Sequence, residues 1–153
     1  MTSQANHNLA ALAEAAFHRL GDYESLVFEG RTYRSGELFD RASRVSSGLV
    51  KLGVSPGERV VVLMANCPEV GITYTAIWRA GAVVTPVVFL VSPHELQHIL
   101  ADSAAVAVVT TPELLATVTA AAAGAPQLRH VIVVGGETES LPEHVRGVDF
   151  AEL

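Results

Sequence analysis

The 153-residue chain has the length of one domain, and half of its residues are hydrophobic, so it can fill a core of its own. The net charge is −6 and no run of Lys and Arg occurs, which argues against nucleic acid as a partner. A single cysteine, Cys67, excludes an internal disulfide and favours the reducing cytoplasm as the location. No apolar stretch is long enough to cross a bilayer, so we predict no transmembrane segment.

The N-terminal region predicts a helix followed by a β-hairpin. Apolar residues recur at helical spacing from Leu9 to Leu20, and a glycine follows. Two short strands, Leu26–Phe28 and Thr32–Arg34, flank Glu29-Gly30-Arg31, a pattern typical of a tight hairpin.

A second amphipathic helix is predicted directly after the hairpin. Ser35 is expected to cap its start, and Gly53 stands where a C-terminal cap glycine belongs. The polar face offers two ion pairs at (i, i+4) spacing. They are Glu37 with Arg41 and Asp40 with Arg44.

From residue 59 onward, apolar strands alternate with helices. The expected strands are Arg59–Ala65, Ala82–Val88, Ala105–Thr110 and His130–Val134. The expected helices are Pro68–Ala80, Ser92–Ser103 and Pro112–Ala123. The short connections favour βαβ units. We therefore predict the α/β class, a layered and mainly parallel sheet flanked by helices, with an N-terminal helix and β-hairpin.

Residues 1–153 are expected to form a single α/β domain. After Gly135-Gly136 the sequence becomes polar and acidic, so residues 135–153 are predicted to be a loop-rich tail. At most a short strand is expected in this tail, near Val148–Phe150.

The segment His94-Glu95-Leu96-Gln97-His98 has the H-E-x-x-H form of zinc hydrolases. At about 100° per residue, His94 and His98 share one helix face, but the leucines lie on the opposite face. Ser92 and Glu95 also form a capping box, which gives Glu95 a structural role. We therefore interpret this segment as a surface helix with solvated histidines.

No other pattern of catalytic, cofactor-binding or metal-ligating residues is recognisable. Phosphate-loop, dinucleotide-binding and nucleophile-elbow sequences do not occur in the chain. A helix N-terminus could activate Cys67, but a small residue at a helix cap is the simpler interpretation. One alternative is a complete small α/β ligand-binding or regulatory module without catalysis. It would bind its ligand at the strand ends, near Asn66, Pro86, Thr110 and Gly135.

Residues 53–110 nevertheless resemble the N-terminal subdomain of AMP-forming acyl-CoA synthetases, in the adenylate-forming superfamily. The family pattern is matched in chained spacing by the following positions: Gly53, Gly57, Val60, Asn66, Glu69, Gly81-Ala82-Val83, Pro86, Glu95-Leu96, Leu100 and Asp102-Ser103. Glu58 replaces the usual Asp, and Val87-Val88-Phe89-Leu90 is more apolar than in many relatives. This apolar segment looks most like that of the fatty-acid–CoA ligases.

The resemblance implies a parent enzyme that uses ATP, Mg2+ and coenzyme A to activate a carboxylic acid, with a fatty acid as the expected substrate. The family's phosphate loop and catalytic lysine come later than the segment present here. We therefore expect an N-terminal fragment that is an inactive scaffold and lacks its partner, the remainder of the ligase. Exposed apolar surface then predicts a homo-oligomer.

Overall fold

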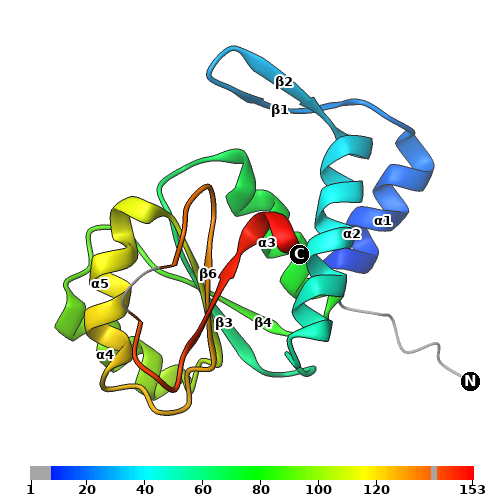
Figure 1. Cartoon of the computed structure of the whole chain (residues 1–153). Helices are drawn as coiled ribbons and strands as arrows, with labels where there is room; N and C mark the ends of the chain where they lie inside the picture. The colour runs from blue at the N-terminus through cyan, green and yellow to red at the C-terminus, as the bar shows by residue number, and fades with distance from the viewer. Residues whose placement is uncertain (1–7, 139–140) are drawn as a thin grey trace, which may run out of the picture.

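The computed structural model describes residues 8–138 and 141–153. A five-stranded parallel sheet with the order β4-β3-β5-β6-β7 lies between helices, and a separate two-stranded hairpin projects from one end (Figure 1). The predicted α/β class, with its mainly parallel sheet, is confirmed. None of the helices in the described part of the chain is long and apolar enough to span a membrane.

The elements follow the sequence pattern closely. The helices are α1 (Leu9–Leu20), α2 (Ser35–Lys51), α3 (Pro68–Arg79), α4 (Pro93–Ser103), α5 (Pro112–Ala122) and the 3₁₀ turn η1 (Phe150–Glu152). The strands are β1 (Glu24–Phe28), β2 (Arg31–Arg34), β3 (Arg59–Leu63), β4 (Val83–Pro86), β5 (Ala107–Thr110), β6 (His130–Val133) and β7 (Arg146–Asp149). Strands β4 and β5 are shorter than the apolar runs suggested.

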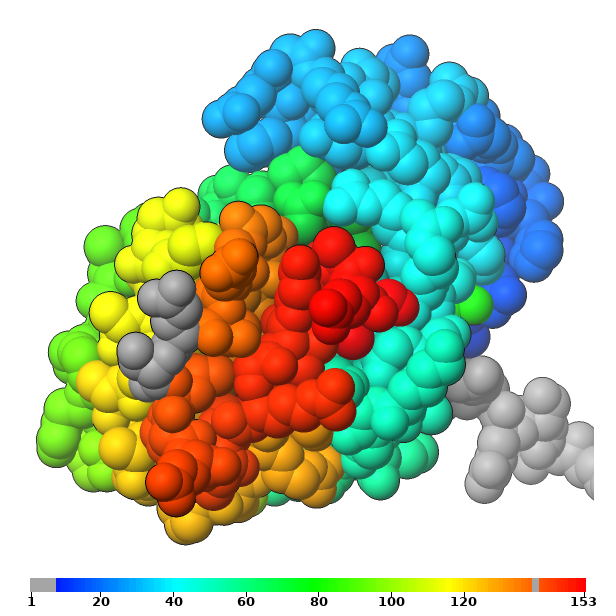
Figure 2. All heavy atoms as spheres, viewed as in Figure 1, coloured from blue at the N-terminus to red at the C-terminus, as the bar shows by residue number. Residues whose placement is uncertain are grey.

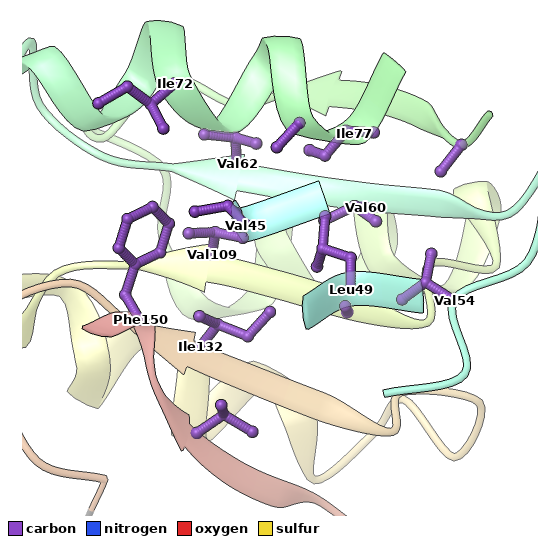
Figure 3. Close-up of a cluster of buried hydrophobic side chains, with 14 of the residues drawn as sticks. Val45, Leu49, Val54, Val60, Val62, Ile72, Ile77, Val109, Ile132 and Phe150 are labelled. Carbon is purple, nitrogen blue, oxygen red and sulfur yellow. The ribbon is translucent and has the colours of Figure 1, made fainter. Parts of the chain in front are cut away.

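Alternate residues of the central strands enter two separate cores. Val60 and Val62 of β3 pack with α2 and α3, in the cluster drawn in Figure 3. Val61 and Leu63 pack with α4 and α5 on the opposite face. This alternation is the two-residue period of a strand that is covered on both sides, which explains the unbroken apolar run.

The start of α2 differs from the sequence-based expectation. Ser35 is the first helical residue, and its side chain accepts a hydrogen bond from the Tyr23 N–H at 3.0 Å instead of capping the helix. The Asp22 carboxylate accepts from the Gly36 N–H at 2.9 Å and from Arg34. A residue from the preceding loop therefore stabilises this helix end.

The two ion pairs expected along α2 were also predicted wrongly. Glu37 pairs with Arg31 of the hairpin at 2.8 Å, and Arg41 pairs with Glu69 of α3 at 2.6 Å. Residues outside α2 thus replace the expected partners of Glu37 and Arg41, and Asp40 and Arg44 form no ion pair among the described residues.

The tail contains a regular strand. Strand β7 pairs in parallel with β6, from His130 opposite Arg146 to Val133 opposite Asp149, and forms one edge of the sheet. The buried Phe150 then enters the core between the sheet and α2 (Figure 3). The predicted short strand is therefore present, about two residues earlier than expected; residues 139–140 of the tail lie outside the described part.

Candidate functional site

The carboxyl ends of the parallel strands carry a hollowed surface that is built from several elements. A parallel α/β sheet places ligands at this edge, outside the strand ends. Here it has two hollowed regions, one beside β6 and β7 and one beside β3 and β4.

The first region is a cleft of about 540 Å3 between the ends of β6 and β7 and helices α2 and α3. Figure 2 shows the segment that ends the chain lying against α2 on this side of the molecule. The charged lining residues are Arg41, Arg44, Glu69, Glu137 and Asp149. No hydroxyl, thiol or imidazole side chain is among the described residues that line the cleft, so its charged groups are limited to carboxylates and guanidinium groups.

Much of the charge in this cleft is already engaged. Burial raises the pKa of Glu69, but the hydrogen bond from Arg41 at 2.6 Å, a hydrogen bond from the backbone N–H of Glu69 itself and the positive charge of Arg41 together hold this pKa below its usual value. The Asp149 carboxylate accepts from the Ala151 N–H at 2.9 Å and caps η1. Arg44 and Glu137 are therefore the charged groups left to meet a ligand.

The second region is a hollow of about 400 Å3 lined by β3, α3 and the loop after β4. Residues 87–91 form this loop, which we call the apolar loop. Val88 is 68% exposed and Leu90 80% exposed, and on its other side the loop borders a shallow apolar hollow beside α4. Exposed apolar residues that are adjacent in this way mark a contact surface.

The four strand-end residues named from the sequence do not form one site. Asn66 and Pro86 line the hollow beside β3 and β4, whereas Gly135 lines the cleft beside β6 and β7. Thr110 is fully buried, and its hydroxyl donates to the Leu63 carbonyl at 2.9 Å. Thr110 therefore connects β5 to β3 and is not open to a ligand.

Cys67 is at the N-cap of α3, but it is not an activated thiol. Burial raises its pKa, and the nearby Glu69 carboxylate raises it further. This agrees with the structural interpretation of Cys67 as a small residue at a helix cap.

The H-E-x-x-H segment has the geometry expected of a capped surface helix. The Ser92 N–H donates to the Glu95 carboxylate at 2.9 Å, and the capping box is complete. Leu96 and Leu100 are fully buried, while both histidines are exposed. Across the described ranges 8–138 and 141–153, no group of three or more His, Cys, Asp or Glu side chains is arranged to hold a metal ion.

Sequence reasoning missed the polar contacts at the amino end of the sheet. Arg129 donates to the Glu58 carboxylate at 2.7 Å and to the Gly53 carbonyl at 3.1 Å. The hydrogen bond from Arg129 lowers the pKa of Glu58, which also accepts from the Ser55 N–H at 2.8 Å. His130 lies 2.9 Å from the Leu52 carbonyl, and burial lowers its pKa. A search for acids next to tight turns could have found Glu58, but not its partner Arg129 or His130.

Comparison with known proteins supports, over most of the chain, the family that the sequence resembles. The family model described as "AMP-binding enzyme" matches residues 12–150. A feruloyl-CoA synthase from an Amycolatopsis species is 41% identical over 107 residues, which are 69% of this chain and 22% of that protein. Triostin synthetase I from Streptomyces triostinicus is 35% identical over 134 residues, which are 86% of this chain and 25% of that protein.

Solved structures share the fold. A long-chain-fatty-acid CoA ligase from Rhodopseudomonas palustris superposes with a TM-score of 0.85 at 23% identity, over 98% of this chain and 37% of that one. A benzoate CoA ligase from Burkholderia xenovorans gives a TM-score of 0.77 at 27% identity, over 95% and 27% respectively. The chain thus spans about a fifth to a quarter of the length of the first two relatives. Because the family model covers nearly all of it, the chain belongs to the family of AMP-binding enzymes.

Proposed function

We propose that this chain is the N-terminal part of an ATP-dependent, AMP-forming carboxylate–CoA ligase and that it is an inactive scaffold on its own. The family match over residues 12–150 carries the proposal. Several relatives from bacteria and a fungus are named as CoA ligases or CoA synthases, which supports coenzyme A as the acceptor of the acyl group. The cytoplasm is the proposed location, as the single Cys67 suggested.

The parent enzyme would run two half-reactions with ATP, Mg2+ and coenzyme A. The carboxylate attacks the α-phosphorus of ATP, which releases pyrophosphate and forms an acyl-adenylate. The thiol of coenzyme A then attacks the acyl carbon, which releases AMP and forms the thioester.

We infer that the cleft beside β6 and β7 does not bind a nucleoside triphosphate. The cleft beside β6 and β7 has three carboxylates against two guanidinium groups, one of which is already paired with Glu69. Such a lining carries no excess of positive charge that would attract a polyphosphate. We therefore propose that this chain's contribution is the sheet and its two cores, which position surfaces for the remainder of the enzyme.

The substrate class is proposed as a fatty acid, because the apolar loop looks like that of fatty-acid ligases and because several relatives carry that name. An aromatic acid is a second candidate, favoured by the 41% identity to feruloyl-CoA synthase. A panel of fatty and aromatic acids, assayed for pyrophosphate release with the parent enzyme, separates the two classes.

The first test is the coding sequence after the Leu153 codon. An open frame that encodes a Ser/Thr/Gly-rich segment ending in Gly-Lys supports the ligase. The longer product should then release pyrophosphate with ATP, Mg2+ and a carboxylic acid, while residues 1–153 alone should release none. Acyl-CoA formation by the 153-residue chain would contradict the scaffold proposal.

A second candidate is a complete ligand-binding module, favoured by the cleft of about 540 Å3 at the strand ends. A stop codon directly after Leu153 would support it. A ligand screen should then find a compound whose binding is lost in Arg44→Ala.

A further inference from the structure

The proposed ligase function assigns no role to the exposed histidine pair on α4. His94 and His98 are one helical turn apart, and both are exposed. Their ring centroids lie 4.5 Å apart, with the ring planes at 89°. The two imidazoles are therefore already in edge-to-face contact on the solvent side of the helix.

This spacing suits a shared metal ion. Histidine nitrogens bind divalent transition metals at about 2.1 Å, so two rings bound to one ion must stand nearly in contact. Two histidines at (i, i+4) on one helix face meet that requirement with small side-chain rotations. Imidazole ligands suit Cu2+, Ni2+ and Zn2+, and the affinity order places Cu2+ first.

The helix holds the pair in place. The capping box of Ser92 and Glu95 fixes the first turn, and Pro93 occupies the first helical position. Leu96 and Leu100 are fully buried on the opposite side and fix the rotation of the helix about its axis. Little conformational entropy is then lost from the backbone when an ion binds.

The local charge permits a cation. The helix N-terminus itself disfavours positive charge. The Glu95 carboxylate, next to His94 in the chain, adds negative charge close to that ring. The whole chain is also acidic, with a net charge of −6.

The site differs from the zinc-hydrolase interpretation in its ligand count. Glu95 is held by the Ser92 N–H and hydroxyl at 2.9 and 2.6 Å, so it does not turn toward the histidines. We propose that His94 and His98 form a two-ligand surface site for one divalent transition-metal ion, whose remaining positions are filled by water. The site binds metal without catalysing hydrolysis, and it is independent of the ligase activity.

The test is calorimetric titration of the untagged 153-residue chain with CuCl2 in a non-coordinating buffer. We expect one ion per chain at this site. His94→Ala and His98→Ala should each weaken binding about tenfold or more, because the second imidazole binds at a high effective concentration. His18→Ala, which removes an exposed but solitary helical histidine, is the matched control and should not weaken it.

A rescue variant separates chelation from a general effect of histidine content. Asp102 is exposed and lies one turn after His98 on α4, so Asp102→His in the His94→Ala background restores an (i, i+4) pair. We expect this double variant to regain tight binding. Equal affinity in His94→Ala, His98→Ala and the unaltered chain would overturn the proposal, as would failure of the rescue.

A second measurement does not depend on calorimetry. Substoichiometric Cu2+ should broaden the imidazole proton signals of His94 and His98 before those of His18 and His144 in an NMR spectrum. Broadening that begins at His18 or His144 would place the ion elsewhere and overturn the assignment.

Discussion

The two ends of the parallel sheet are built differently. At the amino end, Arg129 joins the loop before β3, through Glu58, to the start of β6. Arg59 donates to the carbonyls of Ser103 and Ala104 at the end of α4, and His130 contacts the Leu52 carbonyl after α2. Side chains that are distant in sequence therefore close this end.

At the carboxyl end, Thr110 and the pair Arg41–Glu69 make comparable contacts. Beside them lie the cleft at Gly135 and the apolar loop, with Leu90 80% exposed. The amino end is thus closed by side-chain contacts, whereas the carboxyl end is hollowed and has an exposed apolar loop. We call them the closed end and the open end. Strand ends that carry function are open in this way in α/β proteins generally.

The sharpest test of this difference is the same substitution at both ends. Glu58→Ala removes the partner of Arg129 and the acceptor of the Ser55 N–H, and Glu58 is only a quarter exposed. We expect a loss of about 1 to 2 kcal/mol in the free energy of unfolding, measured by urea denaturation.

The matched control is Glu137→Ala in the cleft at the carboxyl end. Glu137 is exposed and no hydrogen bond or ion pair of its side chain is present among the described residues, so the free energy of unfolding should change by less than about 0.5 kcal/mol. Equal losses at the two ends would refute the contrast.

Thr110→Val tests the contact that is buried at the open end. Valine keeps the volume but removes the hydroxyl that donates to the Leu63 carbonyl, at a position with no solvent exposure. We expect a loss of about 1 kcal/mol by denaturant unfolding, because a buried carbonyl loses a donor. Thr75→Val is the control, since its hydroxyl bonds within its own helix at the surface. A loss as large in Thr75→Val would show that the buried position is not special.

Local patterns in the sequence were enough to predict the elements. The unbroken apolar run of β3 and the capping box of α4 involve neighbouring residues, and both are present as expected. The (i, i+4) pairs of α2 failed because Arg41 finds Glu69, which is 28 residues away. Spacing rules within a helix identify possible ion-pair partners, but tertiary packing determines which pairs form.

The candidate site could be predicted only in part, because its shape depends on strand order. The alternation of strands and helices correctly indicated four residues that follow or end a strand: Asn66, Pro86, Thr110 and Gly135. The order β4-β3-β5-β6-β7 then separates Gly135 from the first two and buries Thr110 in the middle. Periodicity carries no information about which strands are neighbours.

His130 adds a pH test of the closed end. Burial lowers its pKa in the folded chain from the ordinary value of 6.5, so the unfolded chain binds more protons just below that pH. The free energy of unfolding should therefore decrease as pH falls from about 6.5 toward the folded pKa.

His130→Gln removes the titrating group at this position while it leaves an amide that can donate to the Leu52 carbonyl. Its unfolding free energy, followed by urea titrations between pH 7.5 and 5.5, should fall less steeply than that of the unaltered chain. We expect this change in slope to be smaller than the losses above. An unchanged slope would show that another group carries the pH dependence.

Leu90→Ser is expected to have the smallest effect on stability. It tests whether the apolar loop at the open end drives self-association. The side chain is 80% exposed, so the free energy of unfolding should change by less than about 0.5 kcal/mol. If the apolar loop drives self-association, sedimentation velocity over a range of concentrations should show a dimer or larger species that this substitution weakens. Val50→Ser, at a 55% exposed position on α2, should leave the association unchanged. A clean monomer of the unaltered chain at high concentration would contradict the oligomer, and the apolar loop would then be left for contacts within the parent enzyme.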